Sequence, residues 1–284
     1  MNRSVLLLCL AAVPAGLFAQ AGAPPAVLQI TREFIKEGKG SAHRKVEQEY
    51  VSAFRKNNFP FYYVGLSSVS GPNEVWFLDA FPSFAAFEQS DRLESQAPLR
   101  DDIEAIEARD GELRSGSREM TAIYRADLSY IPINGLSIGK TRYMAISTYR
   151  VRPGHEEEFM AGETLLNNAY KSAMAESSVL VYQITAGVPD GTYLLLFPMA
   201  SLKEMDDAPA REQALMNAMG SDGFRKLMKS VGDVFVSTES NIFSVSPDIS
   251  YVPKEIEDED PGFWRQAPSA APSKPKRKAA TSTK

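Results

Sequence analysis

Hydrophobic and polar residues alternate in several segments rich in Ile, Tyr, Phe, Thr and Val, a pattern typical of half-buried strands. The first strand predicted in this way is Val27–Ile35, and a matching segment later in the chain is Tyr143–Val151. After the first strand, apolar residues recur every three or four positions at Val46, Tyr50 and Phe54, as they do on one face of a helix. A strand followed by a helix is therefore predicted at the start of each half.

Each helix is followed by a predicted hairpin, then by a second helical region and a last strand. In the second half, Pro189-Asp190-Gly191 is a tight-turn sequence between the two hairpin strands. The order in each half is β-α-β-β-α-β, the split arrangement of ferredoxin-like units. The predicted hairpin strands and last strands are Phe61–Val69, Val75–Phe81, Thr121–Tyr130, Val179–Ala186, Thr192–Phe197 and Phe235–Val245.

The two halves also share sequence landmarks in the same order. From Gly71 to Asp91 the second half aligns at a constant offset of 116 residues, so that Gly71 matches Gly187. Both halves end with a similar sequence, Asp127–Pro132 in the first and Asp248–Pro253 in the second. These matches predict an internal duplication, with one module over residues 27–132 and another over 142–253.

The predicted fold class is α+β, with two fused ferredoxin-like modules whose antiparallel sheets pack face to face as an α+β barrel. A four-stranded sheet of this kind carries helices on one face only. Its other face needs cover, because apolar surface is stabilised by about 25 cal/mol per Å² when it leaves water. A second sheet in the same chain supplies that cover.

The N-terminus has the features of a secretory signal over residues 1–21. Arg3 is followed by an uncharged apolar stretch, Val5–Phe18, and Ala19-Gln20-Ala21 fits the cleavage pattern, although a cut before Gln20 fits as well. A membrane anchor is the competing interpretation, but the stretch falls short of the ~20 residues that span a bilayer. Export to the periplasm or the medium is therefore predicted, with no transmembrane segment in the mature chain.

Composition limits the chemistry of the mature chain. Its only cysteine, Cys9, lies inside the predicted signal, which leaves no thiol, disulfide or Cys ligand. The net charge of −5 argues against a nucleic-acid partner. Residues 254–284 are an acidic run followed by six basic side chains among Pro, Ala, Ser and Thr, and are predicted to be a charged disordered tail. Binding to an anionic surface is the alternative role for that tail.

The segment Tyr143–Phe159, with the sequence YMAISTYRVRPGHEEEF, resembles the opening of the dimeric α+β barrel superfamily. The similarity is greatest to its NIPSNAP-like and antibiotic-biosynthesis-monooxygenase-like branches. The resemblance implies a barrel made by two ferredoxin-like units, here from one chain, as in chlorite dismutase-like haem proteins. Members include cofactor-free monooxygenases and haem-binding or haem-degrading enzymes. The matching segment carries no catalytic residue, so no role is transferred.

Two histidines, His43 and His155, are the candidate catalytic residues. They are predicted to occupy equivalent helix-start positions in the two halves, where a neutral imidazole could act as a haem ligand or a general base. Helix starts are usually exposed, which favours the interpretation that neither has a role. No metal site is predicted, because two distant histidines without cysteine do not provide the three or four ligands of a zinc site.

Five aromatic residues on the predicted strands are candidates for lining a ligand pocket. Ordinary packing in the core or at an interface is the competing interpretation. The five are Tyr63, Trp76, Tyr149, Tyr182 and Tyr193.

These features predict an exported protein that binds a small apolar molecule or a protein partner through the barrel fold. The alternative is a cofactor-free monooxygenase or haem-dependent enzyme acting on an aromatic or lipophilic substrate. No cofactor is predicted from the residues themselves, and haem is left open by the resemblance. The pattern of residues does not decide whether the protein is an enzyme, and it leaves the oligomeric state open.

Overall fold

The computed structural model describes residues 24–265. The predicted signal at residues 1–21 and most of the predicted tail lie outside this range. The first half contains β1 (Val27–Ile35), α1 (Gly40–Lys56), β2 (Tyr63–Ser68), β3 (Glu74–Phe81), α2 (Phe84–Glu94), α3 (Leu99–Asp110) and β4 (Arg114–Tyr124). After the 3₁₀ turn η1 (Ile138–Lys140), the second half contains β5 (Tyr143–Val151), α4 (Glu156–Ser172), β6 (Leu180–Ala186), β7 (Thr192–Met199), η2 (Leu202–Met205), α5 (Ala208–Val234) and β8 (Phe235–Val245).

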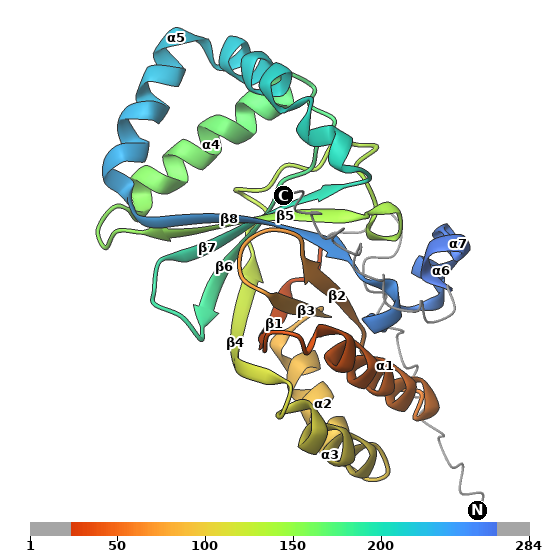
Figure 1. The fold of residues 1–284 in the computed structure, drawn as a ribbon. Coiled ribbons are helices and arrows are strands. Elements are labelled where there is room, and N and C mark those ends of the chain that lie inside the picture. The colour runs from red at the N-terminus through yellow and green to blue at the C-terminus, as the bar shows by residue number, and fades with distance from the viewer. Residues whose placement is uncertain (1–23, 266–284) are drawn as a thin grey trace, which may run out of the picture.

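The eight strands within residues 24–265 form one closed antiparallel barrel, in the order β1-β3-β2-β8-β5-β7-β6-β4. Each half contributes four neighbouring strands with the same connectivity, β4-β1-β3-β2 and β8-β5-β7-β6. Helices α1, α2 and α3 lie outside the barrel on the side of the first half, and α4 and α5 lie outside it on the other side (Figure 1). The first strand of each half has the bounds predicted from the sequence.

The predicted packing of two sheets face to face is wrong, because hydrogen bonds join the sheets edge to edge at two seams. At one seam β2 pairs with β8, and Leu66 lies opposite Val245. At the other seam β4 pairs with β6, and Ala122 lies opposite Ile184. Closure satisfies the N–H and C=O groups that each four-stranded sheet would otherwise expose at its edges. The apolar inner faces are buried by the same step.

Alternation along each strand divides the core into an interior and two outer layers. Leu28 and Ile30 point into the barrel and belong to the central cluster, together with Trp76 and Phe243. Residues of the opposite parity point outward and pack under the helices, as Val75 does beneath α1 and α3. A third apolar cluster lies between the second half of the barrel and α4.

The chain continues past β8 through a 3₁₀ turn, η3 (Pro247–Ile249), and two short helices, α6 (Lys254–Glu259) and α7 (Pro261–Trp264). Ile256 and Trp264 are fully or almost fully buried in the central cluster, and the Trp264 indole Nε1 donates to the Gly139 carbonyl at 2.9 Å. Order therefore extends beyond Pro253, where the charged tail was expected to begin. No helix within residues 24–265 combines the length and apolarity needed to cross a bilayer.

Candidate functional site

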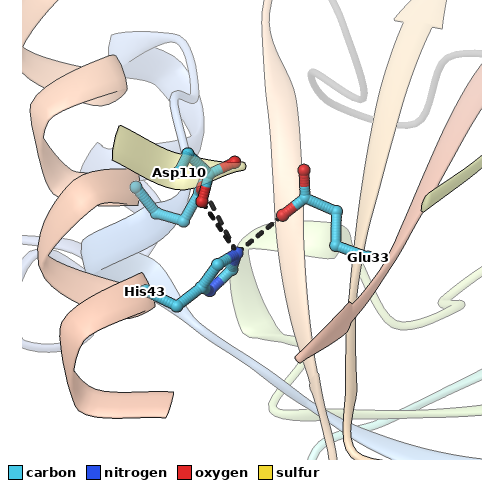
Figure 2. A group of neighbouring side chains, drawn as sticks. Glu33, His43 and Asp110 are labelled. Carbon is cyan, nitrogen blue, oxygen red and sulfur yellow. Dashed lines mark hydrogen bonds and ion pairs between the residues drawn. The ribbon is translucent and has the colours of Figure 1, made fainter. Parts of the chain in front are cut away.

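A cluster of buried ionisable side chains lies between the outer face of the barrel and the helices of the first half. Glu33 comes from β1, His43 and Glu47 from α1, and Asp110 from the last residue of α3. Figure 2 shows Glu33, His43 and Asp110 pointing toward one another. His43 Nε2 lies 2.6 Å from Glu33 Oε2, 3.4 Å from Glu47 Oε1 and 3.6 Å from Asp110 Oδ1. One ligand atom from each of the four residues lies within 4.8 Å of the others.

Negative charge dominates this cluster. Arg114, at the start of β4, pairs with Glu33 and with Asp110, where its Nε lies 2.8 Å from Oδ2. Burial, together with the neighbouring carboxylates of Glu33 and Asp110, raises the pKa of Glu47 well above its ordinary value. Burial and the Glu33 carboxylate also raise the pKa of Asp110. The site therefore holds more acidic groups than its one guanidinium can balance.

A second candidate site is an apolar cavity of about 130 Å³ at one end of the barrel. The strand register brings its lining residues to this end, because Val64 lies opposite Leu78 and Leu180 lies opposite Leu196. The loop between the two halves covers the cavity, and α6 and α7 hold that loop through the Trp264 contact and a hydrogen bond from Ser137 to Glu259. Apolar lining residues are Leu28, Val64, Leu78, Met144, Leu180 and Leu196.

Four hydroxyl groups lie around this cavity, and three have partners. Tyr182 donates to the Pro25 carbonyl, Ser137 donates to Glu259, and Thr141 donates to the Ser137 carbonyl. The Ser178 hydroxyl is buried and makes no hydrogen bond to the described residues. A buried polar group without a partner costs about 1–3 kcal/mol, so Ser178 marks a point where a ligand could bind.

An open groove adjoins the cavity on the side of the second half. The groove measures about 1310 Å³ and lies between the C-terminal end of α4, the start of α5 and the loop at residues 129–136. It shares four lining residues with the cavity: Ile131, Leu136, Ser178 and Pro198. The shared wall makes the groove the natural approach to the cavity.

The two candidate histidines lie in different environments. His43 is the fourth residue of α1 and points into the acidic cluster, with 1% of its surface exposed. His155 directly precedes α4, is partly exposed, and has its Nδ1 2.6 Å from Glu158 Oε2. At the offset of 116 residues, the position of His43 corresponds to Phe159 rather than to His155. Neither histidine lines the cavity or the groove.

The five aromatic candidates do not meet at one site. Tyr182 and Trp76 belong to the barrel interior, and Tyr182 alone among the five lines the cavity. Tyr63 packs in the outer layer under α1, whereas Tyr149 and Tyr193 pack in the outer layer under α4. The aromatic residues helped to predict the strands. They did not show which rings point into the barrel and which point outward under the helices.

Glu33, Glu47, Asp110 and Ser178 were not among the residues singled out from the sequence. A signal for Glu47 was present, because it follows His43 by four residues and so shares a helix face with it. Its neighbour Val46 belongs to the apolar stripe of that helix, which places a charged residue beside the buried face. Asp110 carried no comparable signal, since its role depends on α3 packing against α1.

Comparison of the sequence with protein-family models and with curated proteins finds no match. Solved structures do match. An anthrone oxidase-like protein aligns with a TM-score of 0.53 and 13% identity, covering 78% of this chain and 92% of its own. A protein provisionally described as a monooxygenase, from Fusobacterium nucleatum, aligns with a TM-score of 0.50 and 11% identity, covering 77% and 91%. The fold is a dimeric α+β barrel.

A chlorite dismutase from Candidatus Nitrospira defluvii also aligns, with a TM-score of 0.49 and 12% identity, over 83% of this chain and 96% of its own. The dimeric α+β barrel fold agrees with the resemblance seen in the sequence. The narrower branches and the internal duplication stay predictions.

Proposed function

We propose that the protein binds one small, largely apolar molecule in the cavity at the barrel end. The observation that carries this proposal is an apolar space that contains a single unpaired hydroxyl, that of Ser178. Apolar walls with a few placed polar groups are typical of small-molecule sites. Among the described residues that line the cavity, Tyr182 alone has a titratable side chain, which favours binding over acid–base chemistry.

Size restricts the ligand to one ring. An apolar cavity of about 150 Å³ accommodates a benzene molecule, and the present cavity is of similar volume. The unpaired hydroxyl favours a ring that bears one hydrogen-bonding group. A monocyclic phenol combines both properties, so phenol is the probe of choice and toluene is its apolar counterpart.

Phenol is expected to bind saturably to the purified protein and to be preferred over toluene. Ser178→Ala should weaken phenol binding about three- to tenfold, because one hydrogen bond is worth about 0.5–1.5 kcal/mol, and should leave toluene binding unchanged. Leu180→Phe should abolish binding of both probes by filling the cavity. Chemical-shift titration by NMR measures these affinities.

The control for these variants is Ser52→Ala, because Ser52 is an exposed serine on α1 whose hydroxyl donates to its own helix. Equal affinity of wild-type protein and Leu180→Phe for phenol would place any binding outside the cavity and refute the proposal. Oxygen uptake in the presence of phenol would instead support catalysis at the same cavity.

The fold shared with proteins described as a monooxygenase and as anthrone oxidase-like supports a second candidate, oxidation of an aromatic or lipophilic molecule. A histidine-ligated haem does not fit the arrangement of this chain. His43 is enclosed by carboxylates, His155 contacts Glu158 at the surface, and neither lines the cavity or the groove formed by residues 24–265. Any oxidation here would therefore proceed without histidine-ligated haem.

Added haemin is expected to give no Soret band that depends on either histidine. Absorbance from 350 to 600 nm of wild-type protein, His43→Ala and His155→Ala should be the same after haemin addition, since neither imidazole can reach an axial position. Circular dichroism checks that both variants are folded. A saturable band that disappears in one folded variant would contradict this expectation.

A further inference from the structure

The acidic cluster of the first half contains buried oxygen atoms without hydrogen-bond partners. Glu47 Oε1 and Asp110 Oδ1 make no hydrogen bond among the described residues, whereas Asp110 Oδ2 lies 2.8 Å from Arg114 Nε. Glu47 is 4% exposed and Asp110 is 1% exposed. Buried polar groups in folded proteins are almost always paired, so these oxygens indicate a partner other than the protein. The Glu47 oxygen points at His43 Nε2 and thus into the cluster.

Charge indicates which kind of partner fits. With histidine neutral and all three acids ionised, as metal ligands must be, the carboxylates of Glu33, Glu47 and Asp110 and the guanidinium of Arg114 sum to about −2. A buried charge of this size is very unfavourable unless it is compensated. One divalent cation would neutralise the cluster and would satisfy the unpaired oxygens in the same step.

In the second half of the barrel, the positions that correspond to the acidic cluster show that a helix can pack on the sheet there without charged residues. Val151 of β5 lies opposite Phe235, at the same irregularity in the ladder where Ile35 of β1 lies opposite Arg114. Glu33 and His43 correspond in the same way to Tyr149 and Phe159, which pack against Phe235 with ring centroids 5.0 and 6.0 Å away.

An aromatic layer therefore fills the space that the acidic cluster occupies in the first half. Of the cluster residues compared, Glu47 alone has an acidic counterpart in the second half, Glu163. Packing of a helix on a sheet therefore does not explain why the first half has buried ionisable residues at these positions.

We propose that Glu33, His43, Glu47 and Asp110 together bind one divalent transition-metal ion, Zn²⁺ or Mn²⁺. An imidazole nitrogen with carboxylate oxygens is a ligand set suited to these ions. Bonds of about 2.1 Å to a tetrahedral ion place the ligand atoms about 3.4 Å apart. The separations of 3.4 and 3.6 Å already match, and the 2.6 Å contact between His43 and Glu33 has to lengthen.

The ion would act as a structural clamp. Four protein ligands leave a tetrahedral ion without an open position, which is the arrangement of structural rather than catalytic zinc sites. The ligands come from β1, α1 and α3, so the ion would fix two helices to the barrel wall. Arg114, which pairs with Glu33 and Asp110, would orient these two carboxylates.

The test is titration of chelator-treated full-length protein with ZnCl₂ and with MnCl₂ by isothermal calorimetry. One ion per chain should bind, and saturation should raise the thermal midpoint by about 5–10 °C. Glu47→Gln should weaken binding at least about tenfold, because loss of a residue that only supports a ligand already costs this much. Glu163→Gln changes the corresponding glutamate of the other half and should bind the ion as wild type does.

Wild-type protein that takes up neither ion in a saturable 1:1 complex overturns the proposal, whether or not Glu47→Gln folds. Equal affinity of wild-type protein and folded Glu47→Gln overturns it as well. In that case the cluster is neutralised by protons alone. Loss of affinity in Glu47→Gln together with unchanged affinity in Glu163→Gln is the supporting result.

Discussion

Replacement of Gly187 by alanine is expected to lower the free energy of unfolding by about 2–6 kcal/mol. Gly187 directly follows β6 and has a φ of +96°, which already disfavours any residue with a Cβ. An added Cβ would also lie 2.0 Å from the Glu119 carbonyl oxygen and 2.9 Å from Met120 Cα on β4. Strand β4 would have to move away, and the seam that closes the barrel would open.

Gly154→Ala provides the matched control, because Gly154 has a φ of +88° but no heavy atom within 4 Å of an added Cβ. The free energy of unfolding of that variant should fall only by the cost of a positive φ in a residue with a Cβ, about 1–3 kcal/mol. Urea denaturation followed by circular dichroism measures both values. If the two variants were equally destabilised, the close approach of β6 to β4 at Gly187 would be refuted.

The positions of single strands could be predicted from the sequence, whereas the pairing between distant strands could not. Gly187 illustrates the difference. The alternation in Val27–Ile35 and Tyr143–Val151 fixes two strands without any knowledge of the partner strands. In the sequence alone, Gly187 suits a turn or a bulge, because a positive φ and a close backbone contact both favour glycine. Which sheet edges pair depends on twist and register over the whole barrel, and no single segment encodes that.

The candidate site shows the same limit. His43 was identified because histidine is scarce in this chain, and its burial would follow from the helix face that it shares with Val46 and Glu47. The partners that define its chemistry come from β1 and α3, and they meet only after α3 packs against α1. A search for cysteine and histidine ligands also overlooks sites built mainly from carboxylates. For this reason the sequence, with two distant histidines and no cysteine in the mature chain, predicted no metal site.

Replacement of Glu163 by glutamine is expected to stabilise the protein at pH 8 by about 3 kcal/mol and to have little effect at pH 4. Glu163 lies on the buried face of α4, and burial raises its pKa from the usual 4.5 to about 7. The folded state therefore binds a proton that the unfolded state releases between these two values. Stability from this group is fully present below about pH 4.5 and is lost as the pH rises through 7. Glutamine imitates the protonated form at every pH, and so it should remove this loss.

Unfolding free energies of wild-type protein and Glu163→Gln at several pH values between 4 and 8 test this expectation. Wild-type stability should also fall with rising pH because of Glu94, whose pKa burial likewise raises to about 7. The informative quantity is therefore the difference between the two proteins, which should grow steadily across this interval. Glu212→Gln changes an exposed glutamate on α5 and should show no such growth. A pH-independent difference for Glu163→Gln would mean that water reaches this carboxyl group, and the packing of α4 on the barrel would then be looser than its buried residues imply.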